Sequence, residues 1–217
     1  MRYLYCVINE GTRLNLGNIG VEDREVYTIP YKSISLVVHD SEKAPELSKD
    51  DHVISHQYII SLFTKRFNTV IPFGMNTFIN EEKVTPFMEK NYETLKKKLE
   101  LLKDKSEFVI KIFYEPKPKT TELKESVKGY IDEQKRLRKE VIEEVARLRE
   151  EFHNQIKDVA DDTRLRDDEE DKVSLLSVSC LMHKDRVEEL ERVLEKMKSL
   201  EGFSVSLNGP LTVCSFA

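Results

Sequence analysis

The stretch VIPFGMNTF, residues 70–78, decides what kind of fold and site the chain can build. It starts with β-branched residues, passes through Pro72, Gly74 and Asn76, and then becomes apolar again. Its glycine has neither the GxGxxG nor the GxxxxGK[ST] spacing, which argues against a phosphate-binding loop. The stretch therefore predicts a strand with Pro72 at a sheet edge or bulge. Asn80 is then placed to cap the helix that follows.

Upstream of this stretch, the sequence predicts three strands and a helix. The strands are expected at residues 2–8 (RYLYCVI), 26–29 and 34–38, with Pro30 at a turn or edge between the last two. The helix starts near Ser48 and has an acidic first turn. Its expected apolar stripe consists of Val53, Tyr58, Ile59, Leu62, Phe63 and Phe67.

Downstream, residues 81–103 predict a second helix with an acidic start and a Lys-rich end. Residues 108–114 (FVIKIFY) are expected as the strand that closes this domain. Mixed strands and helices in this order predict an α+β fold. We expect an N-terminal ferredoxin-like α/β sandwich over residues 1–116, with its helices on one face of the sheet.

The rest of the chain, residues 117–217, predicts a long charged amphipathic helix and a smaller C-terminal α+β unit. The segment EPKPKTT at 115–121 breaks the chain, and the long helix follows at about 122–160. Its apolar positions step by 4, 4, 3, 4, 4 and 3 residues, a stripe that stays nearly straight and needs a partner surface. These positions are Leu137, Val141, Val145, Leu148, Phe152, Ile156 and Val159. The partner surface could be the chain's own domain or another chain.

After the long helix, an exposed acidic loop is expected at residues 161–171. Strand, helix, strand and strand should then fill 173–217. Asp185 is the expected cap of this last helix and Gly202 ends it. A turn at residues 208–210 precedes a final strand that runs to the C-terminus.

Composition excludes several classes of function. The net charge of −5, with 35% charged and 39% hydrophobic residues, argues against nucleic-acid binding. No segment predicts a signal peptide or a membrane span, so we expect a cytoplasmic protein that does not enter the membrane. Cys6, Cys180 and Cys214 form no CxxC pair and lie in apolar runs, which predicts ordinary buried thiols.

No motif indicates catalysis. His52 and His56 have the helical spacing of metal pairs, but no third ligand is evident and the pattern lacks the Glu of HExxH. His39, His153 and His183 have no nearby Cys or Ser in the sequence that suggests a dyad. We therefore expect no catalytic, metal or cofactor site. An enzyme whose acid and base groups assemble only in space stays an alternative.

Three separated stretches resemble the gas vesicle protein F/L family (GvpF/GvpL): residues 2–8, 70–116 and 178–217. The family begins with a YLYG strand, has an LPxRFGTxF strand in its middle, and ends in GPLPPYSF. The matching residues are Tyr3, Leu4, Tyr5, Pro72, Thr77, Lys111, Gly209, Pro210, Leu211, Ser215 and Phe216, and His56 falls where the family often has a helix histidine. The chain departs from the pattern at Cys6, Gly74, Asn76, Val213 and Cys214.

The resemblance implies a non-enzymatic accessory protein of gas vesicle assembly. Its implied partners are the hydrophobic shell protein and other accessory proteins, and its implied location is the gas vesicle. The residues that we expect at a partner-binding surface are Pro72, Phe73, Asn76, Thr77 and Phe78. The alternative is a ferredoxin-like interaction or sensor module that dimerises through the long helix.

Overall fold

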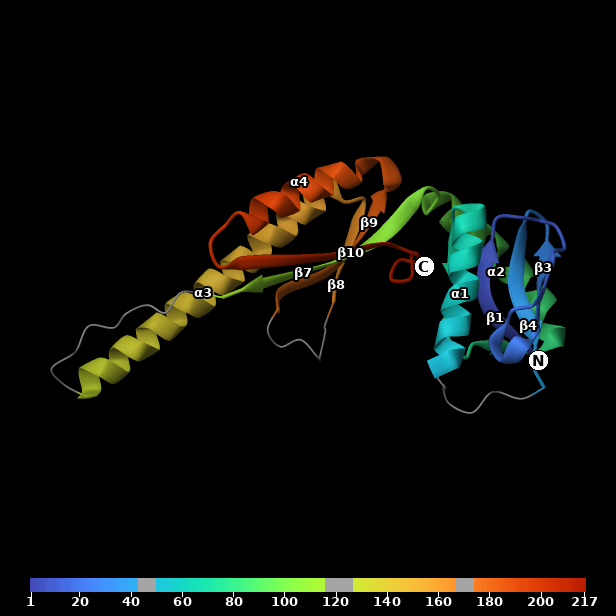
Figure 1. The fold of residues 1–217 in the computed structure, drawn as a ribbon, viewed down its shortest axis with the longest axis horizontal. Helices are drawn as coiled ribbons and strands as arrows, with labels where there is room; N and C mark the ends of the chain where they lie inside the picture. Colours follow the sequence, from blue (N-terminus) through green and yellow to red (C-terminus); the bar gives the residue numbers. More distant parts are fainter. Residues whose placement is uncertain (43–49, 116–126, 167–173) are drawn as a thin grey trace. The chain divides into compact units, whose positions relative to one another are not determined.

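The computed structural model describes residues 1–42, 50–115, 127–166 and 174–217. Contacts divide the chain into two units. Unit 1 contains residues 1–106 together with the C-terminal residues 211–217, and unit 2 contains residues 107–210. Each unit has its own sheet and its own helices (Figure 1).

Unit 1 is built on a mainly antiparallel sheet with the strand order β2-β3-β4-β1-β5, and β6 also pairs with β1. Every residue of β1 after Arg2 is buried, so this central strand must be covered on both faces. The strands are β1 (Arg2–Ile8), β2 (Asn15–Asn18), β3 (Glu25–Tyr31), β4 (Ile34–Asp40), β5 (Val70–Pro72) and β6 (Phe78–Ile79).

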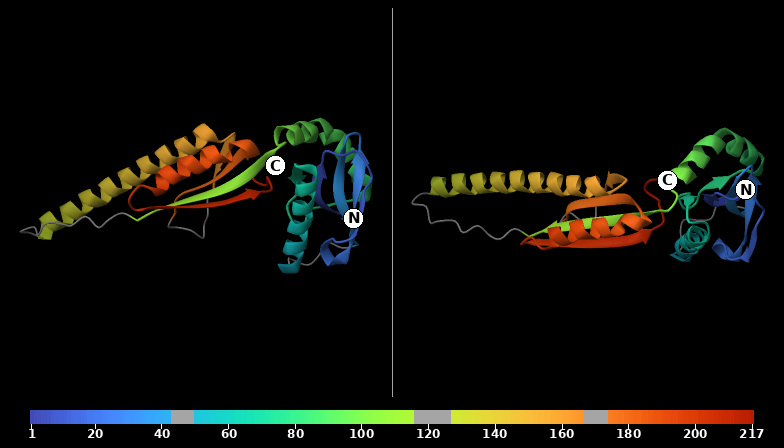
Figure 2. Two further views of the ribbon diagram at one scale, coloured as in Figure 1. Left: turned by 45° about the horizontal axis from the view of Figure 1, so that its top comes forward. Right: turned by 90° about the horizontal axis from the view of Figure 1, so that it is seen from above.

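Two helices provide that cover. Helix α1 (Asp50–Phe67) buries Ile59, Ile60 and Phe63 against the sheet face that carries Tyr3 and Tyr5. Helix α2 (Glu81–Leu101) packs on the other face, as Figures 1 and 2 show. The expectation of helices on one face of the sheet only is therefore wrong, because β1 is buried on both faces. A short 3₁₀ turn, η1 (Val21–Asp23), leads into β3.

The stretch 70–79 forms two short strands that pair with different parts of β1. In β5, Val70 to Pro72 pair with Ile8 to Cys6, and in β6, Phe78 and Ile79 pair with Tyr3 and Arg2. The residues between the two strands leave the ladder as a turn. Pro72 therefore lies on the edge strand of the sheet, where its missing N–H is tolerated.

The first strands agree with the sequence analysis, with two differences. Strand β3 continues through Pro30, which pairs with Ser35. Pro30 is tolerated because the neighbouring strand β2 reaches only as far as Tyr27. Strand β2 was not expected, because its four residues, NLGN, carry no alternating apolar pattern.

Unit 2 has the order β-α-β-β-α-β, and its sheet has the strand order β10-β7-β9-β8. Both helices pack on the same core, and Figure 1 shows α4 beside the C-terminal half of α3. The elements are β7 (Lys105–Tyr114), α3 (Val127–Val159), β8 (Asp162–Leu165), β9 (Ser174–His183), η2 (Lys184–Arg186), α4 (Val187–Lys198) and β10 (Phe203–Leu211).

The ferredoxin-like order of elements was expected in the N-terminal part of the chain, but it occurs in unit 2. A β-α-β-β-α-β order is the ferredoxin-like pattern, and it occurs in unit 2. In unit 1, four strands precede the first described helix. The strand at 108–114 was assigned to the N-terminal domain, but β7 lies between β10 and β9 in the second sheet. Apolar side chains alternate along β7, and those of Phe108, Ile110 and Ile112 face the core of unit 2. This packing explains why β7 belongs to the second sheet.

Two expectations in the last part of the chain also change. The acidic loop expected at 161–171 contains β8, whose residues 162–165 pair antiparallel with β9, while residues 167–171 lie outside the described ranges. The turn expected at 208–210 lies within β10, and residues 212–217 form no strand. Asp185 belongs to η2, and α4 starts at Val187 without a side-chain cap.

Packing of α3 predicts a large difference between two apolar residues of one helix. Phe152 is 1% exposed and lies in the core of unit 2, whereas Ile142 is 63% exposed. We expect Phe152→Ala to lower the free energy of unfolding by about 3–5 kcal/mol, because it leaves a cavity. The matched control Ile142→Ala should change it by less than about 0.5 kcal/mol. Urea denaturation measures both, and equal effects would contradict this packing.

Candidate protein-binding surfaces

Four aromatic rings form a buried hydrogen-bonded cluster in unit 1: Tyr3, Tyr5, His39 and His56. The Tyr3 hydroxyl lies 2.8 Å from His56 Nδ1, and the Tyr5 hydroxyl lies 2.8 Å from His39 Nδ1. The Tyr3 ring stacks on the His39 ring with centroids 4.8 Å apart. The cluster joins β1, β4 and α1, and so ties the helix to the centre of the sheet.

Hydrogen bonds to the backbone connect this cluster to the turn 73–77. His56 Nε2 lies 3.2 Å from the Phe73 carbonyl oxygen, which can only accept, so Nε2 carries the proton. Nδ1 of the neutral ring then accepts from the Tyr3 hydroxyl. That hydroxyl in turn accepts from the backbone N–H of Asn76 at 3.4 Å. The Tyr5 hydroxyl accepts from the N–H of Val21 at 2.8 Å.

Burial changes the acidity of these groups. It lowers the pKa of His39 to about 4, and the nearby Arg24 charge contributes in the same direction. It also lowers the pKa of His56, against a smaller opposite effect of the hydrogen bond to Phe73. The pKa of Tyr3 is raised by burial. Both histidines are therefore neutral at pH 7, and hydrogen bonds replace the water that their rings lose.

The five residues expected at a partner-binding surface lie in and beside this turn, and all are partly buried. Several of them contact the protein itself: Phe78 meets the Tyr3 ring edge-on, and Phe73 meets Phe87 of α2. The Thr77 hydroxyl donates to the Gly74 carbonyl at 2.5 Å. Pro72 and Asn76 complete the set, Asn76 with a φ of 61°. These contacts give the segment a role in the fold, and partner binding by it remains a prediction.

The outer surface of α1 exposes large apolar side chains. Ile54 is 66% exposed, Tyr58 56% and Val53 38%. Val53 and Tyr58 were expected in the buried stripe of α1, but His56 occupies the core-facing position instead. The expected stripe and the observed buried stripe, which consists of His56, Ile59, Ile60 and Phe63, both have helical spacing. The sequence alone therefore does not distinguish them. We call Val53, Ile54 and Tyr58 the α1 outer face.

Unit 2 contains an open groove of ≈ 600 Å³ between α3 and the strands β8 and β9. Its apolar lining consists of Val141, Ile142, Val145, Ala146, Leu165, Leu175 and Leu176, and Arg149, Glu150, His153 and Ser174 add polar groups. His153 Nε2 lies 3.3 Å from the Thr163 hydroxyl of β8. We call this hollow the α3 groove. Because residues from three elements build it, no local sequence pattern indicates it.

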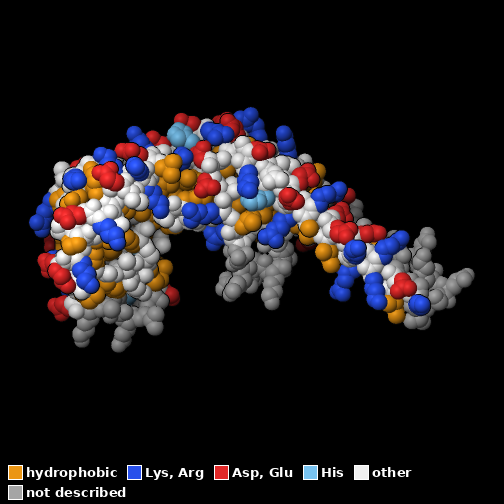
Figure 3. Space-filling model, turned by 180° about the vertical axis from the view of Figure 1, so that it is seen from behind, with side chains coloured by type: hydrophobic (Ala, Val, Ile, Leu, Met, Phe, Trp, Pro, Cys, Tyr) orange, Lys and Arg blue, Asp and Glu red, His pale blue; other side chains and the backbone are white. Residues whose placement is uncertain are grey.

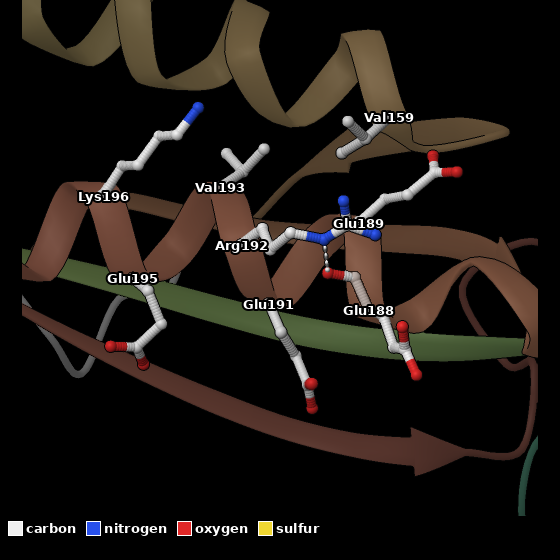
Figure 4. A pocket seen from close by; sticks show the side chains of 8 residues that line it. All are labelled: Val159, Glu188, Glu189, Glu191, Arg192, Val193, Glu195 and Lys196. Atoms are coloured by element: carbon white, nitrogen blue, oxygen red, sulfur yellow. Dashed lines mark hydrogen bonds between the residues drawn. The ribbon is translucent and has the colours of Figure 1, made fainter.

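A second hollow, of ≈ 630 Å³, lies along α4, and charged side chains form most of its lining. Figure 4 shows Glu188, Glu191 and Glu195 along one edge of the helix, while Val193 and Val159 point into the space between α4 and α3. Arg192 Nε donates to the backbone oxygen of Glu188 at 3.2 Å. Exposed charges of this kind are the ordinary outer surface of an amphipathic helix.

The described ranges hold no group of three or more His, Cys, Asp or Glu side chains that could bind a metal. His52 Nε2 lies 3.8 Å from Glu22, while His56 is used in the aromatic cluster. None of the described helices combines the length and the apolar character that crossing a bilayer requires.

Comparisons with known proteins relate the whole chain to one family. The family model described as "Gas vesicle synthesis protein GvpL/GvpF" matches residues 1–217. A sequence comparison with curated proteins finds no match.

Two solved structures are similar in fold. The gas vesicle protein GvpF from Anabaena sp. PCC7120 has a TM-score of 0.76 and 17% identity, over 100% of this chain and 95% of that one. GvpF from Microcystis aeruginosa has a TM-score of 0.73 and 16% identity, over 99% of this chain and 98% of that one. At these identities, the similarity establishes the fold.

The aromatic cluster predicts a measurable contribution of one hydroxyl to stability. Tyr3→Phe removes the donor to His56 Nδ1 and the acceptor for Asn76. We expect it to lower the free energy of unfolding by about 1–2 kcal/mol, because buried polar atoms lose their partners. Tyr58→Phe, which removes an exposed hydroxyl, should change it by less than about 0.5 kcal/mol. Chemical denaturation of both variants checks this, and an unaffected Tyr3→Phe variant would contradict the network.

The cluster also predicts that acid destabilises unit 1. Below its ordinary pKa of 6.5, His39 binds a proton in the unfolded chain, but the folded protein keeps it neutral down to about pH 4. Stability is therefore complete above pH 6.5 and falls as the pH drops towards 4, by up to about 3 kcal/mol. His56 acts in the same direction. Denaturation midpoints between pH 7 and 4 measure the slope, and His39→Gln should make it shallower. A slope unchanged in that variant would exclude His39 as its source.

Proposed function

Because the chain belongs to the gas vesicle synthesis protein GvpL/GvpF family, we propose that it is a non-enzymatic accessory protein of gas vesicle assembly. In this role it binds the hydrophobic shell protein, other accessory proteins of the vesicle, or both. The observation that carries the proposal is the family match over all of residues 1–217. Its place of action would be the gas vesicle, reached from the cytoplasm.

A physical reason supports binding to the shell protein. A subunit that packs into an apolar wall aggregates when it is left alone, and a factor that covers its apolar surface until assembly prevents this. Such a factor needs exposed apolar side chains of its own. The α1 outer face provides Ile54 and Tyr58, four positions apart on the helix, together with Val53 next to Ile54. The buried His56 and Phe63 hold this helix to the sheet. The turn 73–77 is tied to this helix through His56.

A deletion strain tests the function. We expect a strain without this gene to lose normal vesicles, and we expect the wild-type gene to restore them. The shell protein or an accessory protein should co-purify with the tagged wild-type chain. Normal vesicles in the deletion strain, together with no gas vesicle protein retained, would refute the proposal.

Variants of α1 test the surface separately. Ile54→Glu combined with Tyr58→Glu places charges on the α1 outer face, which should reduce co-purified gas vesicle protein at least about tenfold. Thr94→Glu, at an exposed position of α2, adds the same kind of charge elsewhere in unit 1 and should leave binding unchanged. Circular dichroism confirms folding of all variants. If the α1 double variant and Thr94→Glu bind equally well, the contact with the partner does not involve α1, but the accessory role still stands.

The alternative, a module that dimerises through the long helix, is limited by what α3 already contacts. Phe152 and Ile156 are buried in the core of unit 2, and Val145, Leu148 and Val159 pack against that core. This part of the apolar stripe therefore has its partner within the chain. Leu137 and Val141, which are half-buried, are the positions through which a second copy could still pair. Sedimentation of a Leu137→Asp variant beside the wild type tests this alternative.

A further inference from the structure

The α3 groove combines concave shape with exposed apolar side chains. One wall is α3, where Ile142 is 63% exposed, and the other is formed by β8 and β9, where Leu165 is 51% exposed. Figure 3 shows hydrophobic side chains exposed among charged side chains of both signs along α3. Large apolar side chains at the rim of a hollow are a common sign of a protein-binding site.

Positive charges continue this wall of α3 beyond the groove. Helical neighbours lie three, four and seven positions apart. Counting back from Ile142 by these steps gives Lys139, Arg138 and Lys135, and counting forward by seven gives Arg149. A further step of four from His153 gives Lys157. We call Lys135, Arg138, Lys139, Arg149 and Lys157 the basic flank of α3.

The acidic residues of α3 lie mainly on the other side of the helix. Of the described acidic side chains of α3, Glu140, Glu144, Glu151 and Asp158 lie there, while Asp132, Glu143 and Glu150 lie at the border of the groove side. Lys139 and Glu143 form one exposed ion pair, with 3.8 Å between the charged atoms. An exposed pair of this kind is weak and leaves most of the positive charge of the basic flank in place.

The pKa of His153, which lines the groove, responds to the positive charges of the basic flank. Its pKa is lowered by partial burial and, next, by the positive charges of Lys157 and Arg149. The basic flank therefore acts on a residue that lines the groove itself.

We propose that the α3 groove binds an acidic amphipathic helix of a partner protein. Helix-in-groove recognition places apolar residues at i, i+3, i+4 and i+7 into the groove, and the flanking charges select the partner. Here the apolar lining receives the apolar side of that helix, and the basic flank faces its carboxylates. The wall from Lys135 to Lys157 is about 33 Å long, which matches a helix of about 20 residues.

A second copy of this chain does not have the required chemistry in its described residues. Beside the carboxylates on the acidic side of α3, Leu148 packs against the core of unit 2 and Leu137 is half-buried. Helix α4 is acidic outside, but its apolar residues Leu190, Leu194 and Met197 are buried in the core of unit 2. The groove thus fits a different protein better than it fits itself.

The inference rests on the proposed function only in taking the partner to be a gas vesicle protein. Binding of an acidic helix by the groove is a property of unit 2, whereas the co-purification test above uses the outer face of α1 in unit 1. Each can therefore fail without the other.

Two synthetic peptides and two matched variants test the inference. The probe is a fluorescein-labelled 20-residue helical peptide with Leu at i, i+3, i+4 and i+7 and Glu beside them; its control has Lys in place of Glu. Fluorescence anisotropy with the full chain should give at least about tenfold tighter binding of the acidic peptide, and added salt should weaken it. Arg149→Glu should weaken binding about fivefold or more, while Arg147→Glu, on the opposite flank of the same helix, should change it less than about twofold.

Several outcomes would overturn the inference. Equal effects of the two Arg variants would remove the groove from the contact, and so would equal binding of the two peptides. Sedimentation of the wild type with anionic phosphatidylglycerol vesicles, lost in Arg149→Glu, would make the surface a lipid-binding one. Binding of the acidic peptide only after residues 167–171 are replaced by Gly and Ser would assign the groove to the chain's own acidic segment.

Discussion

The fold of unit 1 depends on burying a strand that carries two tyrosines. Strand β1 lies inside the sheet with helices on both faces, so each polar atom of its side chains needs a partner within the protein. The hydroxyls of Tyr3 and Tyr5 find partners in His56 and His39, and those rings in turn hold α1 and β4. The same bonds extend to the backbone of the turn after β5. One hydrogen-bonded cluster therefore positions a strand, a helix and a loop together.

Local patterns predicted most of the elements. Strand β1 was expected with its observed bounds, because β-branched and aromatic residues fill it, and the long helix was expected from an apolar stripe that continues for seven positions. The errors concerned which strands and helices pack against one another. A strand such as β7 fits either sheet by its own alternation. Its place between β10 and β9, with Phe108, Ile110 and Ile112 in the same core as Phe152 and Ile156, assigns it to unit 2. The ferredoxin-like order of elements was consequently expected in the wrong half.

The candidate surfaces were harder to predict, for the same reason. Helix α1 has two stripes with helical spacing, and its buried one starts with a histidine, which sequence reasoning does not place in a core. The partners of Tyr3 and Tyr5 lie far away in the chain, although two tyrosines on one side of a strand are a signal of a shared environment. The α3 groove joins three elements. Family membership, in contrast, followed from short motifs spread over the whole chain, and the family match confirms it.

Helix α3 extends beyond the core that supports it, and this has a consequence for how stability is distributed. Its C-terminal half is fixed by Phe152 and Ile156, while the turns around Leu137 have few buried contacts to oppose fraying. Amide protons should exchange progressively faster towards the start of the helix. A ligand on this part of α3 would then be recognised by a segment that becomes fully ordered only in the complex. Such coupling lowers the affinity of a complex and speeds its dissociation.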